Sequence, residues 1–477
     1  MPEYLAPGVY VEELPSHTTP IHGVSTGTAG FVGAAERGPT TAVTVTSFAE
    51  YTRWYGGASP SSFLADAVLG FFENAGQRGI VVRVVAANGT TATATIGNLA
   101  LTARGPGDYG NRIRVAIEHP AETEVAAPPG GFRVSIQSDG VRETFDWLTA
   151  EQDLPSDVLG VLNTQSRVIR AAWTDAGAAK PPAQGFTALV GGSDGTIVAN
   201  DYVRALEILA DDDDVALVVV PDQARAGMDA VTAAVIDQCE ASRNRLALVS
   251  APQGQSDVAK VRPPRDTSYA AYYYPWVEVV DAAAAGGTKL VPATGHVAGV
   301  LARVDRERGV GKAPANEAVR GVVGLELPAT SQTQETLHLR GVNAIRDFQS
   351  VQQGIRLWGA RTMASDGEAR YVHLRRFFIF LEQSIARGTQ WVVFEPNAEP
   401  TWEAVRRSVE ALLTAEWRSG ALQGATPEEA FIVTCDRTTM TQADLEAGRL
   451  VCLIGIAAVR PAEFVILRLC QWTADAT

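Results

Sequence analysis

An alternation of short apolar runs with amphipathic segments constrains the fold of this chain more than any other feature. Runs of β-prone residues flank segments whose apolar side chains recur at i, i+4 and i+8, and the alternation returns later in the chain. These runs and segments are residues 28–35, 61–76, 79–86, 201–210, 215–222, 227–242 and 245–252. Strands that alternate with amphipathic helices predict an α/β fold with a mostly parallel sheet covered on both faces. Ser61 or Ser62 is the expected N-cap of the first helix.

Two other parts of the chain differ from this α/β pattern in composition and in the spacing of their apolar residues. Between about Thr90 and Gly192, Thr, Gly and Pro separate short alternating runs, which predicts a β-rich inserted domain. A further helix is expected at residues 295–309. The last 110 residues or so predict a third, α+β block with helices at 371–388 and 401–420, and strands at 391–395, 428–436, 449–459 and 463–472.

Length and composition limit the number of domains and the classes of function that the chain can have. A chain of 477 residues is too long for one core, and two to four domains are expected. Forty Lys and Arg against 54 Asp and Glu give a net charge of −14, which argues against wholesale nucleic-acid binding. The four cysteines are far apart in the sequence and are interpreted as buried thiols: Cys239, Cys435, Cys452 and Cys470. With neither a signal peptide nor a long apolar window, the chain is expected to be cytoplasmic.

Candidate chemistry is sparse. Asp222 ends an expected strand and His296 begins an expected helix, the order of an α/β hydrolase, but no serine lies in a Gly-rich strand-to-helix turn. The loop 191–196 is interpreted as a tight turn in preference to a phosphate loop, and Asp211–Asp214 as a solvated loop in preference to a cation site. The aromatic run at 269–276 is interpreted as core or interface packing. No catalytic residue, cofactor or metal is expected.

The two ends of the chain both predict β-strands. The first strand contains Gly8, Val9, Tyr10, Val11 and Glu12, and the last contains Phe464, Val465, Ile466, Leu467 and Leu469. Terminal strands of this type suggest addition to the edge of a sheet, on this chain or on another subunit. Pairing with each other within one chain remains equally open.

The sequence resembles one known family. The ordered segments "SYAAYYYPW", "GHVAGVLARVDRERGVGKAPAN", "GVNAIRDF", "LWGARTM", "YVHLRRFFIFLEQSIARGTQWVVFEPN" and "PEEAFIVTCD" are similar to those of tail sheath proteins from contractile phage tails and phage-tail-like contractile injection systems. The opening "LAPGVYVEE" also resembles that family. The likeness runs from about Ser268 to Trp472, and the inserted domain has no motif of its own that matches.

The resemblance implies a structural subunit and no enzyme. It implies a helical homopolymer of hexameric rings around an inner tube protein, bounded by baseplate and terminator or cap proteins, without nucleic acid or membrane insertion. It also implies that terminal arms add strands to the C-terminal domains of neighbouring subunits, and that an α/β scaffold loosely similar to subtilisin carries no protease chemistry. The expected division is a terminal arm at 1–24, an α/β core at 25–90 and 193–360, an outer inserted domain at 91–192, an inner domain at 361–460 and a strand arm at 461–477.

One helix is a candidate for the contact with the tube. On the expected helix at 401–420, one side is apolar, and the charged side carries Glu403, Arg406, Arg407 and Glu410. A merely solvated helix face is the equal alternative. An α/β hydrolase and a monomeric binding module are the other functions left open. The sequence does not distinguish a phage tail from an injection system, although the short chain favours the latter.

Overall fold

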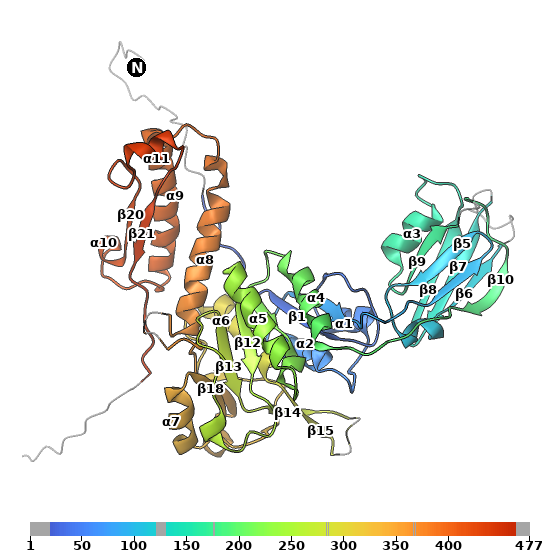
Figure 1. Ribbon diagram of the computed structural model, residues 1–477, viewed down its shortest axis with the longest axis horizontal. Helices are drawn as coiled ribbons and strands as arrows, with labels where there is room; N and C mark the ends of the chain where they lie inside the picture. The colour runs from blue at the N-terminus through green and yellow to red at the C-terminus, as the bar shows by residue number, and fades with distance from the viewer. Residues whose placement is uncertain are drawn as a thin grey trace, which may run out of the picture. The chain divides into compact units, whose positions relative to one another are not determined.

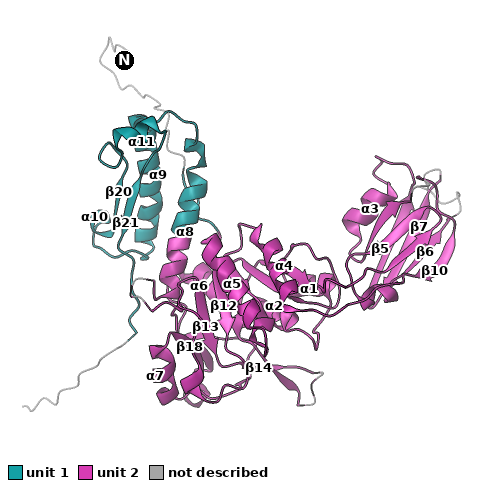
Figure 2. Cartoon of the chain, viewed as in Figure 1, with its two compact units in different colours: residues 1–24, 380–477 teal, residues 25–379 magenta. Residues whose placement is uncertain are grey.

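The structure is a computed structural model that describes residues 20–120, 130–174, 177–282, 284, 286–365, 367 and 369–463. The chain separates into two compact units (Figure 2). Unit 1 comprises residues 1–24 and 380–477, and unit 2 comprises residues 25–379. None of the helices in the described ranges combines the length and the apolar character that crossing a bilayer requires. The fold is mixed α and β, as the sequence predicts.

A nine-stranded sheet forms the centre of unit 2 (Figure 1). Its order is β16-β19-β18-β13-β12-β11-β1-β3-β2, and all neighbours from β18 to β3 are parallel. The outer strands β2, β19 and β16 pair antiparallel. The strands are β1 Ala29–Ala34, β2 Val43–Val45, β3 Gly79–Val84, β11 Leu217–Val219, β12 Leu246–Ser250, β13 Ala270–Tyr274, β16 Glu317–Ala318, β18 Val342–Asp347 and β19 Ile355–Trp358. The predicted mostly parallel sheet is confirmed.

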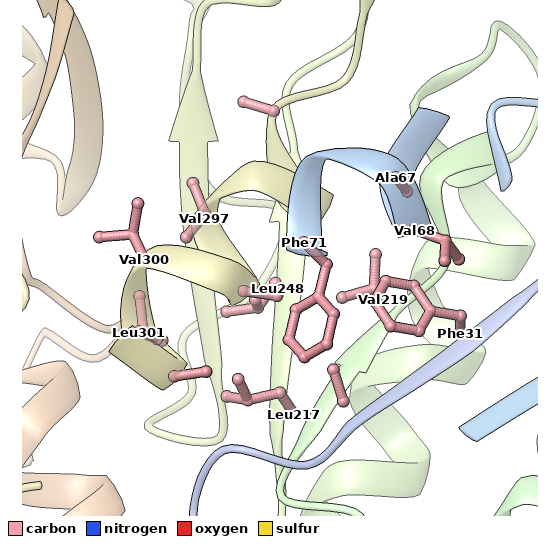
Figure 3. Close-up of a cluster of buried hydrophobic side chains, with 14 of the residues drawn as sticks. Phe31, Ala67, Val68, Phe71, Leu217, Val219, Leu248, Val297, Val300 and Leu301 are labelled. Carbon is pink, nitrogen blue, oxygen red and sulfur yellow. The ribbon is translucent and has the colours of Figure 1, made fainter. Parts of the chain in front are cut away.

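Both faces of this sheet are buried, which explains the continuous apolar runs. Phe31 and Val219 point into one apolar cluster, whereas their neighbours Val32 and Val218 point into the other. Helices α1, α2 and α6 contribute to the first cluster, and α4, α5 and α7 to the second. Figure 3 shows the first cluster, where the Phe31 and Phe71 rings lie 5.3 Å apart edge to face. These helices are α1 Phe48–Tyr55, α2 Leu64–Glu73, α4 Ala199–Ala210, α5 Asp229–Ser242, α6 Thr294–Arg308 and α7 Ser331–Leu339.

Helices α2 and α6 pack unusually closely because glycines line their contact. A Cβ atom at Gly295 would lie 2.3 Å from the backbone of Ala67, and one at Gly299 would lie 2.4 Å from the carbonyl oxygen of Phe71. Distances this short leave no room for a methyl group. The glycines of "GHVAGV" therefore serve close packing between helices. A small antiparallel sheet of β14 Val277–Val280, β15 Thr288–Val291 and β17 Gly324–Leu325 completes this part of unit 2.

The region between β3 and α4 has two further sheets and a hydrophobic core of its own. One sheet has the order β10-β6-β7-β8 and the other β4-β5-β9. Their elements are β4 Thr93–Ile96, β5 Leu99–Ala103, β6 Arg114–Glu118, β7 Phe132–Ser138, β8 Val141–Leu148, α3 Val158–Gln165, β9 Ile169–Trp173 and β10 Gln184–Ala188. The β-rich character predicted for this region is therefore observed. The buried guanidinium of Arg83 in β3 donates to the carbonyl oxygens of Ala35, Gly38 and Pro106 and joins this region to the central sheet.

Unit 1 is built around one long helix and a two-stranded sheet. The helix is α9 Glu399–Arg418, which buries Trp402, Val405, Val409, Leu412 and Leu413, as its periodicity predicts. The other elements are the end of α8 Val372–Gly388, which begins in unit 2, with α10 Pro427–Ala430, β20 Phe431–Thr434, α11 Gln442–Glu446 and β21 Leu453–Ile456. Helix α9 lies against β20.

The strand expected at residues 391–395 is wrong. Residues Gln390–Val392 form a 3-10 turn, and Val393 and Phe394 follow in a loop where they are 65% and 102% exposed. β-branched and aromatic residues favour strands because they fit a pleated, half-buried surface next to another strand. Here the segment only connects α8 with α9, so its composition is not accompanied by strand pairing.

Candidate functional site

The reversal of strand order in the central sheet is the place where α/β proteins usually bind ligands. Strand β1 lies between β3 and β11, and Asp222 lies three residues after the end of β11. The carboxylate of Asp222 is fully buried and accepts hydrogen bonds from the Ser62 hydroxyl at 2.7 Å, the Phe63 N–H at 2.9 Å and the Tyr202 hydroxyl at 2.9 Å. Both carboxylate oxygens are therefore engaged in holding α2, α4 and the central sheet together.

This network corrects the N-cap predicted for α2. The helix begins at Leu64 and its N-cap residue is Phe63, not Ser61 or Ser62. Asp222, 159 residues away in sequence, accepts the Phe63 N–H, while the Ser62 hydroxyl accepts the Leu64 N–H at 3.1 Å. Capping by a distant carboxylate leaves no local sequence pattern, so the residues before the helix could not reveal it.

His296, the other residue of the hydrolase alternative, serves packing. It is 1% exposed on α6, and its ring lies against Gly70 of α2, where a Cβ atom would come within 2.5 Å of Nδ1. Burial lowers the pKa of His296 to about 4, so the ring is neutral near pH 7. Nδ1 has no hydrogen-bond partner, and the side-chain bonds to Asp222 come from other residues. Asp222 and His296 therefore do not form the acid–base pair that the hydrolase alternative requires.

Two loops that could have bound ions have structural partners. In the loop at 191–196, Gly192 exchanges two hydrogen bonds of 2.8 Å with the Asn111 side chain, and Thr196 N–H donates to Asn88. After α4, Asp214 forms an ion pair of 2.9 Å with Arg78. No cluster of three or more His, Cys, Asp or Glu side chains suited to a metal occurs among the residues that the structure describes. The predicted turn and loop are thus observed.

The aromatic run at 269–276 belongs to the core. Tyr272, Tyr273 and Tyr274 of β13 and the following Trp276 are all at most 5% exposed. The Trp276 indole N–H donates to the Ala251 carbonyl at 2.8 Å. The structure therefore shows core packing for this run, in agreement with the prediction of core or interface packing.

The sheet of unit 1 exposes apolar side chains. Ile432 of β20 and Leu453 of β21 are 64% and 60% exposed, and Ile454 is 37% exposed. Within the described residues this sheet has only two strands, so each strand has one edge without a neighbouring strand. Two-stranded sheets are marginally stable alone, and open edges with apolar side chains accept further strands. Sequence patterning predicted both strands but not their exposure, because only the partners of a strand decide which face is covered.

The four charged residues proposed to face a tube lie together on α9. Arg406 forms ion pairs with Glu403 at 3.8 Å and with Glu410 at 3.5 Å, and Arg407 pairs with Glu403. Their side chains are between 36% and 58% exposed. The structure therefore brings all four residues into one surface ion-pair network. Such exposed pairs contribute only about 0–1 kcal/mol each to stability.

The predicted terminal strands, Gly8–Glu12 and Phe464–Leu469, lie outside the described residues. The described start of the chain packs on α8 within unit 1. The Val24 N–H donates to the Ser384 hydroxyl at 3.1 Å, and Ile21 lies against Gly388, where a Cβ atom would approach it to 2.7 Å. The segment that leads to the first predicted strand is thus anchored near the end of α8.

Comparison with family models gives two consecutive matches. Residues 195–363 match the phage tail sheath protein central domain, and residues 364–470 match the phage tail sheath C-terminal domain. Together the matches extend over more than half of the chain. They include β20, β21 and the charged face of α9.

Individual sequence relatives agree with these matches. A putative prophage major tail sheath protein of Pseudomonas aeruginosa (strain UCBPP-PA14) is 27% identical over 191 residues, which cover 40% of this chain and 48% of the relative. A tail sheath protein of Vibrio phage KVP40 is 25% identical over 190 residues, 39% of this chain and 27% of the relative. The matched region thus spans less than half the length of either curated relative.

Solved structures match nearly the whole chain. The helical sheath of the anti-feeding prophage in the contracted state has a TM-score of 0.63 at 23% identity, covering 98% of this chain and 99% of that one. The contracted PVC sheath of an extracellular contractile injection system has a TM-score of 0.62 at 24% identity, covering 100% and 99%. The sheath tail protein Lin1278 of Listeria innocua has a TM-score of 0.64 at 14% identity, covering 92% and 96%.

These structural likenesses define the class of fold, which is that of a contractile-tail sheath protein. The two consecutive domain matches add the family. The chain belongs to the phage tail sheath protein family, as the resemblance of its sequence motifs implies.

Proposed function

We propose that this chain is a structural subunit that polymerises as stacked helical rings around an inner tube and contracts to drive the tube through a target envelope. The observation that carries this proposal is the match of residues 195–470 to two consecutive sheath domains. Support comes from the similarity in fold to two sheaths that were determined in their contracted state. Contraction would then be a switch between two packings of rigid subunits, powered by interface energy and without a nucleotide.

Neighbouring subunits would be connected to one another by strand addition. The terminal strands Gly8–Glu12 and Phe464–Leu469 would pair with the open edges of β20 and β21 in neighbouring copies, where Ile432 and Leu453 offer apolar contacts. Each backbone hydrogen bond contributes only about 1 kcal/mol net, but several such bonds per arm keep subunits connected while they rotate. Head-to-tail contacts of this kind generate an open helix.

The remaining assignments follow the same proposal. The ion-pair network of Glu403, Arg406, Arg407 and Glu410 would face the inner tube, because a weak polar contact lets a sheath release its tube. Baseplate and cap proteins would bound the polymer, which would assemble in the cytoplasm. The region at 91–192 would face outward, and the α/β core at 25–90 and 193–360, loosely similar to subtilisin, would be a scaffold without chemistry.

Strand addition can be tested with a matched pair of variants. Proline removes a backbone N–H and disrupts a strand, whereas isoleucine keeps it. We therefore expect Val9→Pro with Val11→Pro to abolish polymerisation, and Val9→Ile with Val11→Ile to retain it. Sedimentation velocity measures assembly, and circular dichroism checks that both variants fold. Polymerisation by the proline variant, or by a chain lacking residues 1–13, would show that the N-terminal arm does not connect subunits.

A further inference from the structure

Two cysteines that are 17 positions apart in sequence lie next to the last pair of the β20–β21 ladder in unit 1. The antiparallel register pairs Thr434 of β20 with Leu453 of β21, which places Cys435 opposite Cys452 one step further along. The Ala457 N–H donates to the Ala430 carbonyl oxygen at 2.8 Å, which makes these two residues a hydrogen-bonded pair. From this pair onward, hydrogen-bonded and non-hydrogen-bonded pairs alternate along the two strands. When this alternation is extended one step past the ladder, the two cysteines take the position of a non-hydrogen-bonded pair.

This type of pair has the geometry that a disulfide needs. Directly opposed residues in a non-hydrogen-bonded pair have Cα atoms about 4.5 Å apart. A disulfide spans Cα separations of about 4.4–6.8 Å. Both residues are free thiols in the structure, and each thiol is the largest influence on the pKa of the other, as expected for neighbouring side chains. The two thiols are thus neighbours. The sequence predicted buried thiols, which is confirmed for Cys239 and Cys435, whereas Cys452 is only half-buried.

The two thiols have different surroundings. Cys435 is 4% exposed, whereas Cys452 is half-buried, so Cys452 is the more accessible residue of the two. The interaction between the two thiols raises the pKa of Cys435 and lowers that of Cys452. Because Cys452 is also the more exposed residue of the two, it is the attacking thiolate, and Cys435 is the resolving thiol.

We propose that Cys435 and Cys452 are a redox modification site that reacts with a low-molecular-weight disulfide and closes to a reversible cross-strand disulfide. In the first step the Cys452 thiolate attacks one sulfur of the small disulfide and releases a small thiolate, leaving a mixed disulfide. In the second step Cys435, after losing its proton, attacks the Cys452 sulfur and releases the second small thiolate. The two protein thiols are oxidised to one disulfide, the small disulfide is reduced to two thiols, and these take up the two protons.

The bond would fix a sheet that otherwise has only two strands in the described part of unit 1. It would close residues 436–451 into a loop and prevent β20 from separating from β21. The inference rests on the register and the burial of the two cysteines, and it holds whether or not the chain polymerises. We expect hydrogen exchange at the amides of β20 and β21 to slow at least about tenfold on oxidation.

Peptide mapping of the full chain gives a direct test. Reduced protein is incubated with excess oxidised glutathione, its remaining thiols are alkylated, and it is digested with trypsin without reductant. Cleavage after Arg418, Arg437, Arg449 and Arg468 places the three C-terminal cysteines on separate peptides, 419–437, 450–468 and 469–477. We expect peptides 419–437 and 450–468 to be joined within one chain, and the link to disappear with dithiothreitol. No link, a link to peptide 469–477, or a link between two chains would overturn the proposal.

Three serine variants test the order of attack. Cys435→Ser is expected to accumulate glutathione on Cys452, because the resolving thiol is missing. Cys452→Ser is expected to leave Cys435 unmodified, because a 4% exposed thiol is poorly accessible. Cys470→Ser, the matched control, is expected to form the link as the unaltered chain does. Glutathione on Cys435 in the Cys452→Ser variant would overturn the assigned roles.

Discussion

Asp222 connects the start of α2 and helix α4 with the end of β11, since its carboxylate accepts hydrogen bonds from Ser62, Phe63 and Tyr202. We expect Asp222→Ala to lower the free energy of unfolding of unit 2 by about 3 kcal/mol, because it leaves buried donors without an acceptor. Asp211→Ala is the matched control, since that carboxylate is exposed, and its effect should stay within about 0.5 kcal/mol. Urea titration measures both, and equal effects would contradict the role assigned to Asp222.

The burial of His296 predicts that the stability of unit 2 depends on pH. Burial depresses its pKa from 6.5 to about 4, so the folded state binds a proton less readily than the unfolded state does. The stability that His296 contributes is therefore fully present above pH 6.5 and is lost as pH falls from about 6.5 to about 4, by up to about 3 kcal/mol. We expect His296→Asn to show a shallower loss over this range in urea titrations at several pH values. If the free energy of unfolding of the variant falls with pH as steeply as that of the unaltered chain, His296 is not the group that causes the pH dependence.

At the scale of elements, the contact of α2 with α6 depends on glycine. Gly295→Ala should cost about 1–3 kcal/mol, because its Cβ atom would overlap the backbone of Ala67, which cannot move away as a side chain can. Gly160→Ala in the exposed part of α3 is the control, because its Cβ atom meets nothing closer than 3.4 Å. Helix propensity should make the control more stable, by about 1 kcal/mol or less. Thermal unfolding measures both changes, and stabilisation by Gly295→Ala would disprove the close packing.

Elements with strong periodicity could be predicted from sequence. The helix expected at 295–309 is α6 Thr294–Arg308, and that at 371–388 is α8 Val372–Gly388, because in both an apolar stripe recurs over several turns. The strand expected at 391–395 fails, because β-prone composition does not supply a neighbouring strand. The same limit applies to the site: the charged face of α9 followed from local spacing, whereas the pairing of Cys435 with Cys452 depends on strand register.

At the scale of the whole molecule, binding to the proposed inner tube can be measured separately from folding stability. Arg406→Glu with Arg407→Glu disrupts a surface network worth little to folding, so unfolding should change by about 1 kcal/mol at most. Capture of the inner tube protein should fall about tenfold or more if α9 faces the tube. Arg142→Glu with Arg170→Glu, both exposed in the inserted region, makes the same change in charge and should leave capture unchanged. Pull-down with tagged tube protein measures this capture. Equal capture by both variants would show that the charged face of α9 faces solvent and not the tube.

The most direct test of the central proposal is electron microscopy of the purified full-length protein, alone and co-expressed with a candidate inner tube protein. We expect hollow helical tubes of uniform width, with an inner tube in the co-expressed sample. Dispersed globular particles in both samples, at concentrations where other sheath proteins polymerise, would contradict a self-assembling sheath subunit.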